Sequence, residues 1–121
     1  MSDRPQDRAK GLTPARPAST VVILRDAPAG IEVFMVVRHH QIDFASGALV
    51  FPGGKVDPQD AGEAWRETAD FPAAPDRSFF VAAGRETFEE AGLVLARRRG
   101  SADLIDANAA DRLVAAHRAR Y

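Results

Sequence analysis

Three glutamates, Glu86, Glu89 and Glu90, fall within five consecutive residues of a segment that reads as a helix, and Gly92 follows as a helix-ending residue. At about 100° per residue, Glu89 lies about 60° to one side of Glu86 and Glu90 about 40° to the other, so the three carboxylates share one face. Like charges at this spacing cost an isolated helix about 0.2–0.5 kcal/mol. The arrangement suits a bound cation, although a Glu-rich helix face is also typical of a solvated surface.

Composition narrows the chemistry that this face could carry out. The 121 residues, 45% hydrophobic and 27% charged, indicate one soluble globular domain without a membrane span or a secretory signal, which we expect to be cytoplasmic. A formal net charge of -1 gives no overall attraction to nucleic acid or an anionic membrane. The absence of cysteine excludes disulfides, thiolate zinc sites and cysteine nucleophiles. Carboxylate oxygens alone favour Mg²⁺ or Mn²⁺ over zinc.

The elements that must position the carboxylates follow from residue patterns. β-Branched and apolar runs predict strands at 19–24, 31–38, 48–51 and 93–96, the first two joined as an antiparallel hairpin. Helices are predicted at about 60–68, 77–91 and 106–120. Asp76 is the expected N-cap of the second helix, and Asp106 or Asn108 that of the third.

The helix at 77–91 should pack inward through one stripe. Phe80, Ala83, Thr87 and Ala91 repeat at helical spacing, and Gly84 beside them predicts close approach. The carboxylates would then lie away from the packed stripe.

The turn at 52–54 offers a ligand backbone groups, whereas the histidines are poorly placed to bind one. In Pro52-Gly53-Gly54 the two glycines remove side chains and let backbone groups approach a ligand closely. His39 and His40 are adjacent, so on an extended chain they point to opposite sides and chelate one metal poorly. A solvated loop edge is favoured for them over substrate contact. His117 is expected on a helix surface.

Read together, these segments resemble the Nudix box of the Nudix hydrolases, G-x5-E-x7-R-E-U-x-E-E-x-G-U, where U is a bulky aliphatic residue. Gly54 corresponds to the opening glycine, and Asp60 stands where the family has Glu, keeping the charge with a shorter reach. Thr87 departs from the aliphatic position. The remaining matches are Arg85, Glu86, Glu89, Glu90, Gly92 and Leu93.

The spacing departs from the family pattern. Arg85 follows Gly54 by 31 residues instead of 14, an insertion of 17 that loop-closure entropy tolerates. The chain is thus similar to the Nudix subgroup with an insertion inside the box, some of which are coenzyme A diphosphatase-like. Gly47 ahead of 51–54 also resembles the coenzyme A signature, but Asp43 stands where that signature has arginine. Coenzyme A or its esters are the leading substrate hypothesis.

The resemblance implies an α/β (α+β) fold, a Nudix-type α/β/α sandwich with a mixed sheet that is incomplete at the C-terminus of this chain. We expect a flexible arm at 1–17 and a Nudix domain at 18–121. The domain would contain the box at 54–93 with its insertion at about 61–77, and a C-terminal helix at about 106–120.

The resemblance also implies the site. Glu86, Glu89, Glu90 and the Gly54 carbonyl would hold Mg²⁺ or Mn²⁺, which neutralises charge on a diphosphate and activates water. Glu89 is the expected base, and Arg85 would pair with and orient a glutamate, so that the catalytic set is Glu89, Arg85 and Glu86. Arg38 and Lys55 are the expected substrate contacts.

The implied partner is a small-molecule nucleotide, a nucleoside diphosphate linked to another moiety; neither nucleic acid nor a membrane is expected. A homodimer stays open, because unpaired strands invite pairing with a second molecule. Two alternatives also stay open. One is a Nudix-like binding or regulatory module that does not cleave its nucleotide, and the other is a structural domain whose acidic helix is plain surface.

Overall fold

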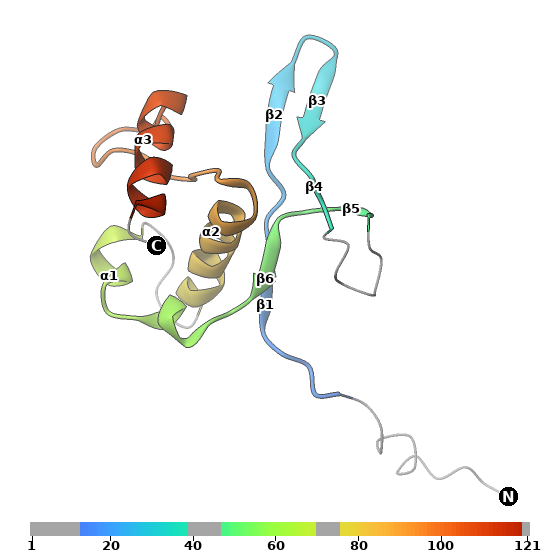
Figure 1. Ribbon diagram of the computed structural model, residues 1–121, viewed down its shortest axis with the longest axis vertical. Coiled ribbons are helices and arrows are strands. Elements are labelled where there is room, and N and C mark those ends of the chain that lie inside the picture. Colours follow the sequence, from blue (N-terminus) through green and yellow to red (C-terminus); the bar gives the residue numbers. More distant parts are fainter. Residues whose placement is uncertain (1–12, 39–46, 70–75, 120–121) are drawn as a thin grey trace, which may run out of the picture.

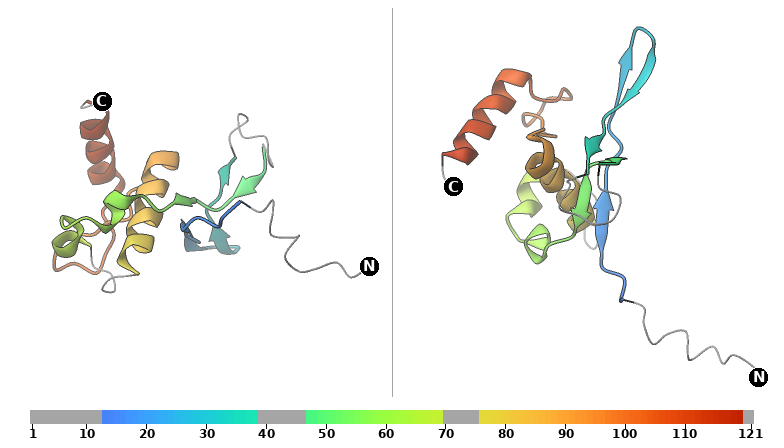
Figure 2. Two further views of the ribbon diagram at one scale, coloured as in Figure 1. Left: turned by 90° about the horizontal axis from the view of Figure 1, so that it is seen from below. Right: turned by 45° about the vertical axis from the view of Figure 1, so that its right-hand side comes forward.

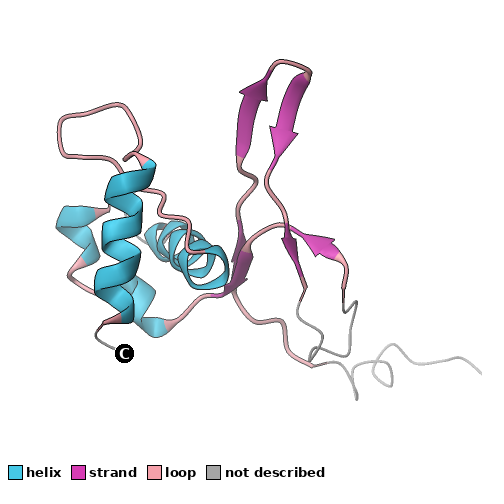
Figure 3. Cartoon of the chain, turned by 45° about the horizontal axis from the view of Figure 1, so that its top comes forward, coloured by secondary structure: helices cyan, strands magenta, loops and turns pink. Residues whose placement is uncertain are grey.

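The computed structural model describes residues 13–38, 47–69 and 76–119. Strands gather on one side of the chain and helices on the other, as Figures 1 and 3 both show. The elements are β1 (Ala18–Thr20), β2 (Leu24–Ala27), β3 (Gly30–Val33), β4 (Val36–Val37), β5 (Leu49–Val50), β6 (Gly53–Lys55), the 3₁₀ helix η2 (Pro58–Ala61), α1 (Trp65–Thr68), α2 (Arg77–Ala91) and α3 (Ala107–Arg118). The expected mixture of helices and strands is therefore present.

Within the described ranges the strands form three antiparallel pairs, β1–β6, β2–β3 and β4–β5. The β1–β6 pair sets Ser19 opposite Gly54 and Thr20 opposite Gly53. The Ser19 hydroxyl also donates to the Phe79 carbonyl at 2.7 Å, which ties β1 to α2. This pair therefore carries Gly53 and the opening box glycine, Gly54, alongside the helix that bears the glutamates.

An antiparallel hairpin is present as predicted, but its first strand, β2, shares only Leu24 with the predicted strand at 19–24, and its turn is shorter than predicted. β2 and β3 turn at Pro28 and Ala29, and the hairpin extends away from the helices in Figure 1 and in the right-hand view of Figure 2. The single strand predicted at 19–24 is wrong, because the chain changes partner there: β1 pairs with β6, whereas β2 pairs with β3. The strand predicted at 31–38 divides in the same way into β3 and β4.

The strand predicted at 93–96 is also wrong. In that part of the described chain the only ladder contact is an isolated antiparallel bridge between Arg97 and Leu104. The chain reverses between these residues through Gly100, which adopts a φ of 82°. The apolar run therefore meets a returning loop rather than a neighbouring strand.

Helices were easier to predict than strands. α2 has the predicted bounds and ends at Gly92, whose left-handed φ of 66° places its N–H on the Phe88 carbonyl. The cap at Asp76 is wrong, because this residue already has helical dihedral angles and its side chain makes no cap bond. The Asp106 cap of α3 is confirmed by a 2.8 Å bond from Ala109 N. The helix predicted at 60–68 is two short helices, η2 and α1.

The packed face of α2 differs from the predicted stripe. Thr87 is buried as expected, whereas Phe80 is 45% exposed, and the buried apolar residues are Val81 and Ala82. The face that meets β1, β6 and η2 includes Arg85 and other charged residues of the box. Hydrophobic periodicity treats charged residues as outward-facing, so the stripe predicted from it is rotated around the helix axis from the face that packs.

Gly84 provides a test of this packing. Apart from its chain neighbours and the backbone of its own helix, no atom of the described residues lies within 4 Å of the position that a Cβ at Gly84 would occupy, so the close approach predicted there is wrong. We expect Gly84→Ala to raise the free energy of unfolding by about 0.5–1 kcal/mol, because alanine loses less backbone entropy in a helix. Urea denaturation measures the change. Gly30→Ala, at a φ of +131°, should instead destabilise, and destabilisation by Gly84→Ala would contradict the expectation.

Several sequence predictions fall outside the described residues: those on His39, His40 and Asp43, most of the N-terminal arm, positions 70–75 of the insertion, and the last residue of the predicted final helix. Within the described ranges, no helix combines the length and apolar character that a membrane span requires.

Candidate active site

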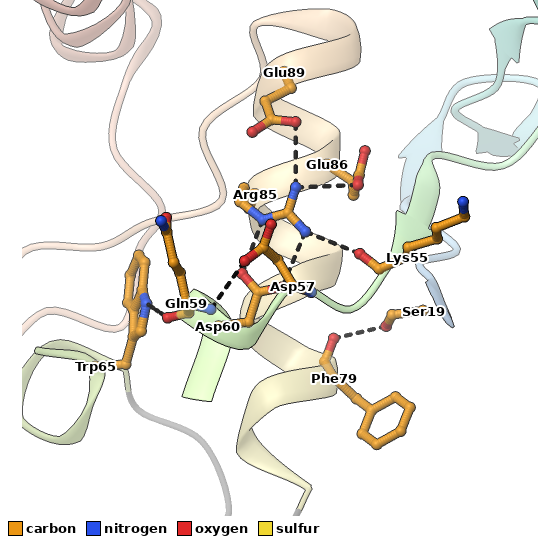
Figure 4. A network of polar contacts seen from close by, with 10 residues as sticks. All are labelled: Ser19, Lys55, Asp57, Gln59, Asp60, Trp65, Phe79, Arg85, Glu86 and Glu89. Atoms are coloured by element: carbon orange, nitrogen blue, oxygen red, sulfur yellow. Dashed lines mark hydrogen bonds and ion pairs between the residues drawn. The ribbon is translucent and has the colours of Figure 1, made fainter. Parts of the chain in front are cut away.

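Arg85 lies at the centre of the candidate site and uses all five of its N–H donors (Figure 4). Nε and Nη2 donate to Asp60 Oδ1 and Oδ2 at 2.8 and 2.9 Å, a bidentate pair. Nη2 also donates to the Lys55 carbonyl at 3.0 Å. Nη1 donates to Glu86 Oε1 at 3.1 Å and Glu89 Oε2 at 3.2 Å. One guanidinium thus joins β6, η2 and two glutamates of the box.

The turn that begins η2 brings Asp60 close to Arg85, so the contact does not depend on a long side chain. The Asp57 side chain accepts from Gln59 N at 3.0 Å, and Asp57 N donates to Asp60 Oδ2 at 2.7 Å, forming a capping box with Pro58 at the first helical turn. The Asp60 side chain is 1% exposed. Its shorter length is therefore sufficient, because the 3₁₀ turn brings its backbone up to α2.

The insertion begins by packing onto the same turn. The Trp65 indole N–H donates to the Gln59 carbonyl at 3.2 Å, next to Asp60 in sequence (Figure 4). Sequence reasoning assigned no role to Trp65. The D-x-x-D spacing of Asp57 and Asp60 around Pro58 was the available signal for this turn.

Gly53 and Gly54 lie directly against the glutamates. A Cβ on Gly54 would lie 2.5 Å from the Glu86 carboxylate carbon, so only glycine leaves this carboxylate its place. Gly53 N donates to Glu90 Oε2 at 3.4 Å, a weak bond. The β6 backbone therefore faces two of the three glutamates.

Two carboxyl groups of the site have pKa values shifted in opposite directions. Burial raises the pKa of Asp60, but hydrogen bonds from Arg85 and Asp57 N together with the Arg85 charge outweigh it, and the net shift is downward. Partial burial raises the pKa of Glu90, the Gly53 N–H opposes this, and the charges of the neighbouring glutamates raise it further. The hydrogen bond to Asp60 raises the pKa of Arg85, so it stays charged.

The donor set fits a hard divalent cation in its chemistry. Glu86, Glu89 and Glu90 offer carboxylate oxygens from one helix face, and Gly54 leaves space beside Glu86 that a Cβ would fill. Across the described part of the chain, however, no three acidic or histidine side chains are already gathered as a cation site. The reason is visible in the contacts: Glu86 and Glu89 turn to Arg85, while Glu90 turns to Gly53.

The remaining predicted residues lie at different distances from this centre. Lys55 joins it through its carbonyl, while its amino group points away from Arg85 in Figure 4. Arg38 follows β4 and pairs by its backbone with Ala48, in the β4–β5 pair rather than beside α2. Thr87, the departure from the aliphatic position, is fully buried and donates to the Ala83 carbonyl at 2.7 Å. Its hydroxyl is thereby satisfied inside the helix.

The lowered pKa of Asp60 predicts that stability is lost in acid. Its folded-state pKa lies below the value of about 3.9 expected for an unfolded aspartate, so the unfolded chain binds the proton more tightly. The contribution of Asp60 is complete above about pH 5 and declines as pH falls through the folded-state pKa. Urea denaturation between pH 6 and pH 3 should show this loss. Asp60→Asn should flatten the profile, and an unchanged slope would contradict the assignment.

Gly54→Ala tests the cradle beside Glu86. The new methyl group would displace the Glu86 carboxylate, and because that carboxylate ends a flexible side chain, the fold should survive. We expect a smaller Mn²⁺-induced rise in Tm than in the unaltered protein, since one ligand moves away. Gly84→Ala on α2 is the matched control and should keep the full rise. Equal Mn²⁺ stabilisation of both variants would show that Glu86 contributes nothing at this place.

Comparison with known proteins bears on the fold of this chain. No protein-family model matches the chain. Its structure is similar to the crystal structure of a Nudix hydrolase from Alicyclobacillus acidocaldarius, with a TM-score of 0.63 and 38% sequence identity over 79% of this chain. The match covers 45% of that hydrolase, so the chain spans less than half of its length. The α/β fold class predicted from the sequence is confirmed. The shared fold and the 38% identity make this chain similar to a Nudix hydrolase over 45% of that hydrolase's length.

Proposed function

We propose that this chain forms the cation-binding core of a Mg²⁺- or Mn²⁺-dependent Nudix hydrolase that cleaves a diphosphate linkage. The substrate class is a nucleoside diphosphate linked to another moiety. The observation that carries the proposal is the Arg85 network, which holds Glu86 and Glu89 on one guanidinium beside the β6 glycines. Similarity to a Nudix hydrolase supports the reaction class.

Each residue of the network has a proposed role. Glu86, Glu89, Glu90 and the Gly54 carbonyl would hold the cation, which supplies charge neutralisation for the diphosphate and acidifies water. Glu89 is the proposed base. Of the two glutamates that pair with Arg85, it is more exposed than Glu86, so its carboxylate can reach solvent. Arg85 fixes the orientation of Glu86 and Glu89, and Asp60 holds Arg85 in place.

Coenzyme A or its esters are the proposed substrates within this class. The support is in the sequence: a 17-residue insertion inside the box, and Gly47 ahead of Phe51-Pro52-Gly53-Gly54. Lys55 follows this segment directly and Arg38 precedes Gly47, so both stay proposed substrate contacts. A nucleotide is the proposed partner whether or not the substrate is coenzyme A.

The test is a turnover assay with defined products. The protein is incubated with Mg²⁺ and, separately, with coenzyme A, ADP-ribose, dinucleotides and nucleoside triphosphates, and the products are identified by mass. We expect two phosphorylated fragments from a diphosphate-linked substrate, with coenzyme A turned over fastest. The hydrolase proposal fails if no compound is cleaved, and the coenzyme A proposal fails if another is strongly preferred.

A binding module that does not cleave is the second candidate. The observation in its favour is that Arg85 already occupies Glu86 and Glu89, and the described residues hold no ready-made cation cluster. Nucleotide binding without turnover would support this candidate. A protein whose Tm does not respond to divalent cations or nucleotides would instead be a structural domain, because a bound ligand stabilises the fold by RT ln(1 + [L]/Kd).

A further inference from the structure

A hollow of ≈ 420 Å³ lies between the last turn of α2 and the helix α3. One wall is the end of the box, residues 88–92, and the other is formed by Val114, His117 and Arg118 of α3. Pockets for small molecules usually measure about 300–1,000 Å³. The hollow is therefore large enough for a nucleoside-sized group and opens beside Glu89 and Glu90.

The sequence and one aromatic contact place α3 against this end of the box. Val114, His117 and Arg118 are spaced i, i+3 and i+4, so they share one face of the helix. The His117 ring meets Phe88 edge to face, with ring centroids 5.1 Å apart. This contact turns the Arg118 face toward the glutamate end of α2.

The two walls differ in charge. Glu89 and Glu90 make one side acidic, Arg118 makes the other basic, and Phe88 and Val114 add apolar surface between them. A diphosphate alone would be repelled by the two carboxylates. A divalent cation held by Glu89 and Glu90 would neutralise that side and could contact a phosphate directly, while Arg118 would supply the net positive charge from the other wall.

We propose that this hollow is the subsite for the nucleoside diphosphate half of the substrate, and that Arg118 contacts its phosphate. The inference rests on the proposed function, because it needs a cation at Glu89 and Glu90. Apolar surface from Phe88 and Val114 packs against the nucleoside. Arg118 is suited to phosphate because its planar fork can donate two parallel hydrogen bonds.

The test is calorimetric titration of the protein with ADP in the presence of Mg²⁺. Arg118→Gln should weaken ADP binding by about tenfold or more, the loss expected when a charge-assisted hydrogen bond is removed. Arg112→Gln is the matched control. Arg112 lies on the same helix about 120° around the axis from Arg118, outside the hollow, so its variant should bind ADP within about twofold of the unaltered protein.

Equal affinities of the Arg118→Gln and Arg112→Gln variants would overturn the subsite, and so would an unaltered protein that does not bind ADP. The turnover assay separates this inference from the hydrolase proposal. ADP binding that depends on Arg118, without cleavage of any compound in the panel, would leave the subsite standing and remove the hydrolase. Turnover with the same KM in the Arg118→Gln variant as in the unaltered protein would support the hydrolase and overturn the subsite.

Discussion

Glu89→Gln should lower kcat for Mg²⁺-dependent hydrolysis by about 10²–10⁴-fold, because glutamine cannot accept the proton that the proposed base removes. The substitution keeps the length of the side chain, and its fold should be nearly as stable as before. The Glu89 side chain is 53% exposed, and exposed ion pairs such as the one it makes with Arg85 contribute about 0–1 kcal/mol. Steady-state kinetics and urea denaturation of the same preparation measure the two effects.

Glu63→Gln is the matched control for this experiment. Glu63 is 81% exposed, and it likewise pairs with an arginine on its own segment, Arg66 at 3.2 Å. Its variant should keep kcat within about twofold. Retention of more than a tenth of kcat by Glu89→Gln would show that another group removes the proton, and Glu86 and Glu90 would be the next residues to substitute.

The helices show how far the sequence alone can be taken. α2 and α3 have strong local signals, namely Gly92 in the left-handed conformation that ends one and Asp106 capping the other, and both were predicted nearly to the residue. The face on which α2 packs could not be predicted in this way. That face is decided by β1, β6 and η2, which are distant in sequence, and it includes Arg85.

The strands were predicted less well because their pairing is not local. Residues 19–24 are rich in β-branched side chains, yet only the first two belong to β1 and only the last belongs to β2, and these strands have different partners, β6 and β3. No periodicity within the run marks the point where the partner changes. The hairpin of β2 and β3 was predictable because its turn and both of its strands are contiguous.

In the candidate site, too, local features could be predicted from the sequence and contacts between distant residues could not. The shared face of Glu86, Glu89 and Glu90 followed from helical geometry, whereas the contact of Gly54 with Glu86 joins residues distant in sequence and was not predicted. The role of Asp60 did not follow. Its contact with Arg85 spans 25 residues of sequence and depends on a 3₁₀ turn whose capping box was present in the sequence but not recognised.

Asp60→Asn should lower the free energy of unfolding by about 3 kcal/mol. Removing one partner of a buried ion pair costs about 3–5 kcal/mol, and the lower figure applies because the Arg85 side chain keeps 24% of its surface exposed. Asparagine keeps the shape of the side chain, but its one carbonyl oxygen cannot accept from Arg85 Nε, Arg85 Nη2 and Asp57 N together. Urea denaturation at pH 7 gives the change.

Asp57→Asn separates the ion pair from the turn that carries it. Asn caps a helix about as well as Asp, so the bond from Gln59 N is kept and the loss should stay within about 0.5 kcal/mol. An equal loss in both variants would mean that the η2 turn, rather than the Arg85 pair, holds this region together. A loss below about 1 kcal/mol for Asp60→Asn would contradict the central place of Asp60, because Arg85 would then be held well enough by Lys55, Glu86 and Glu89.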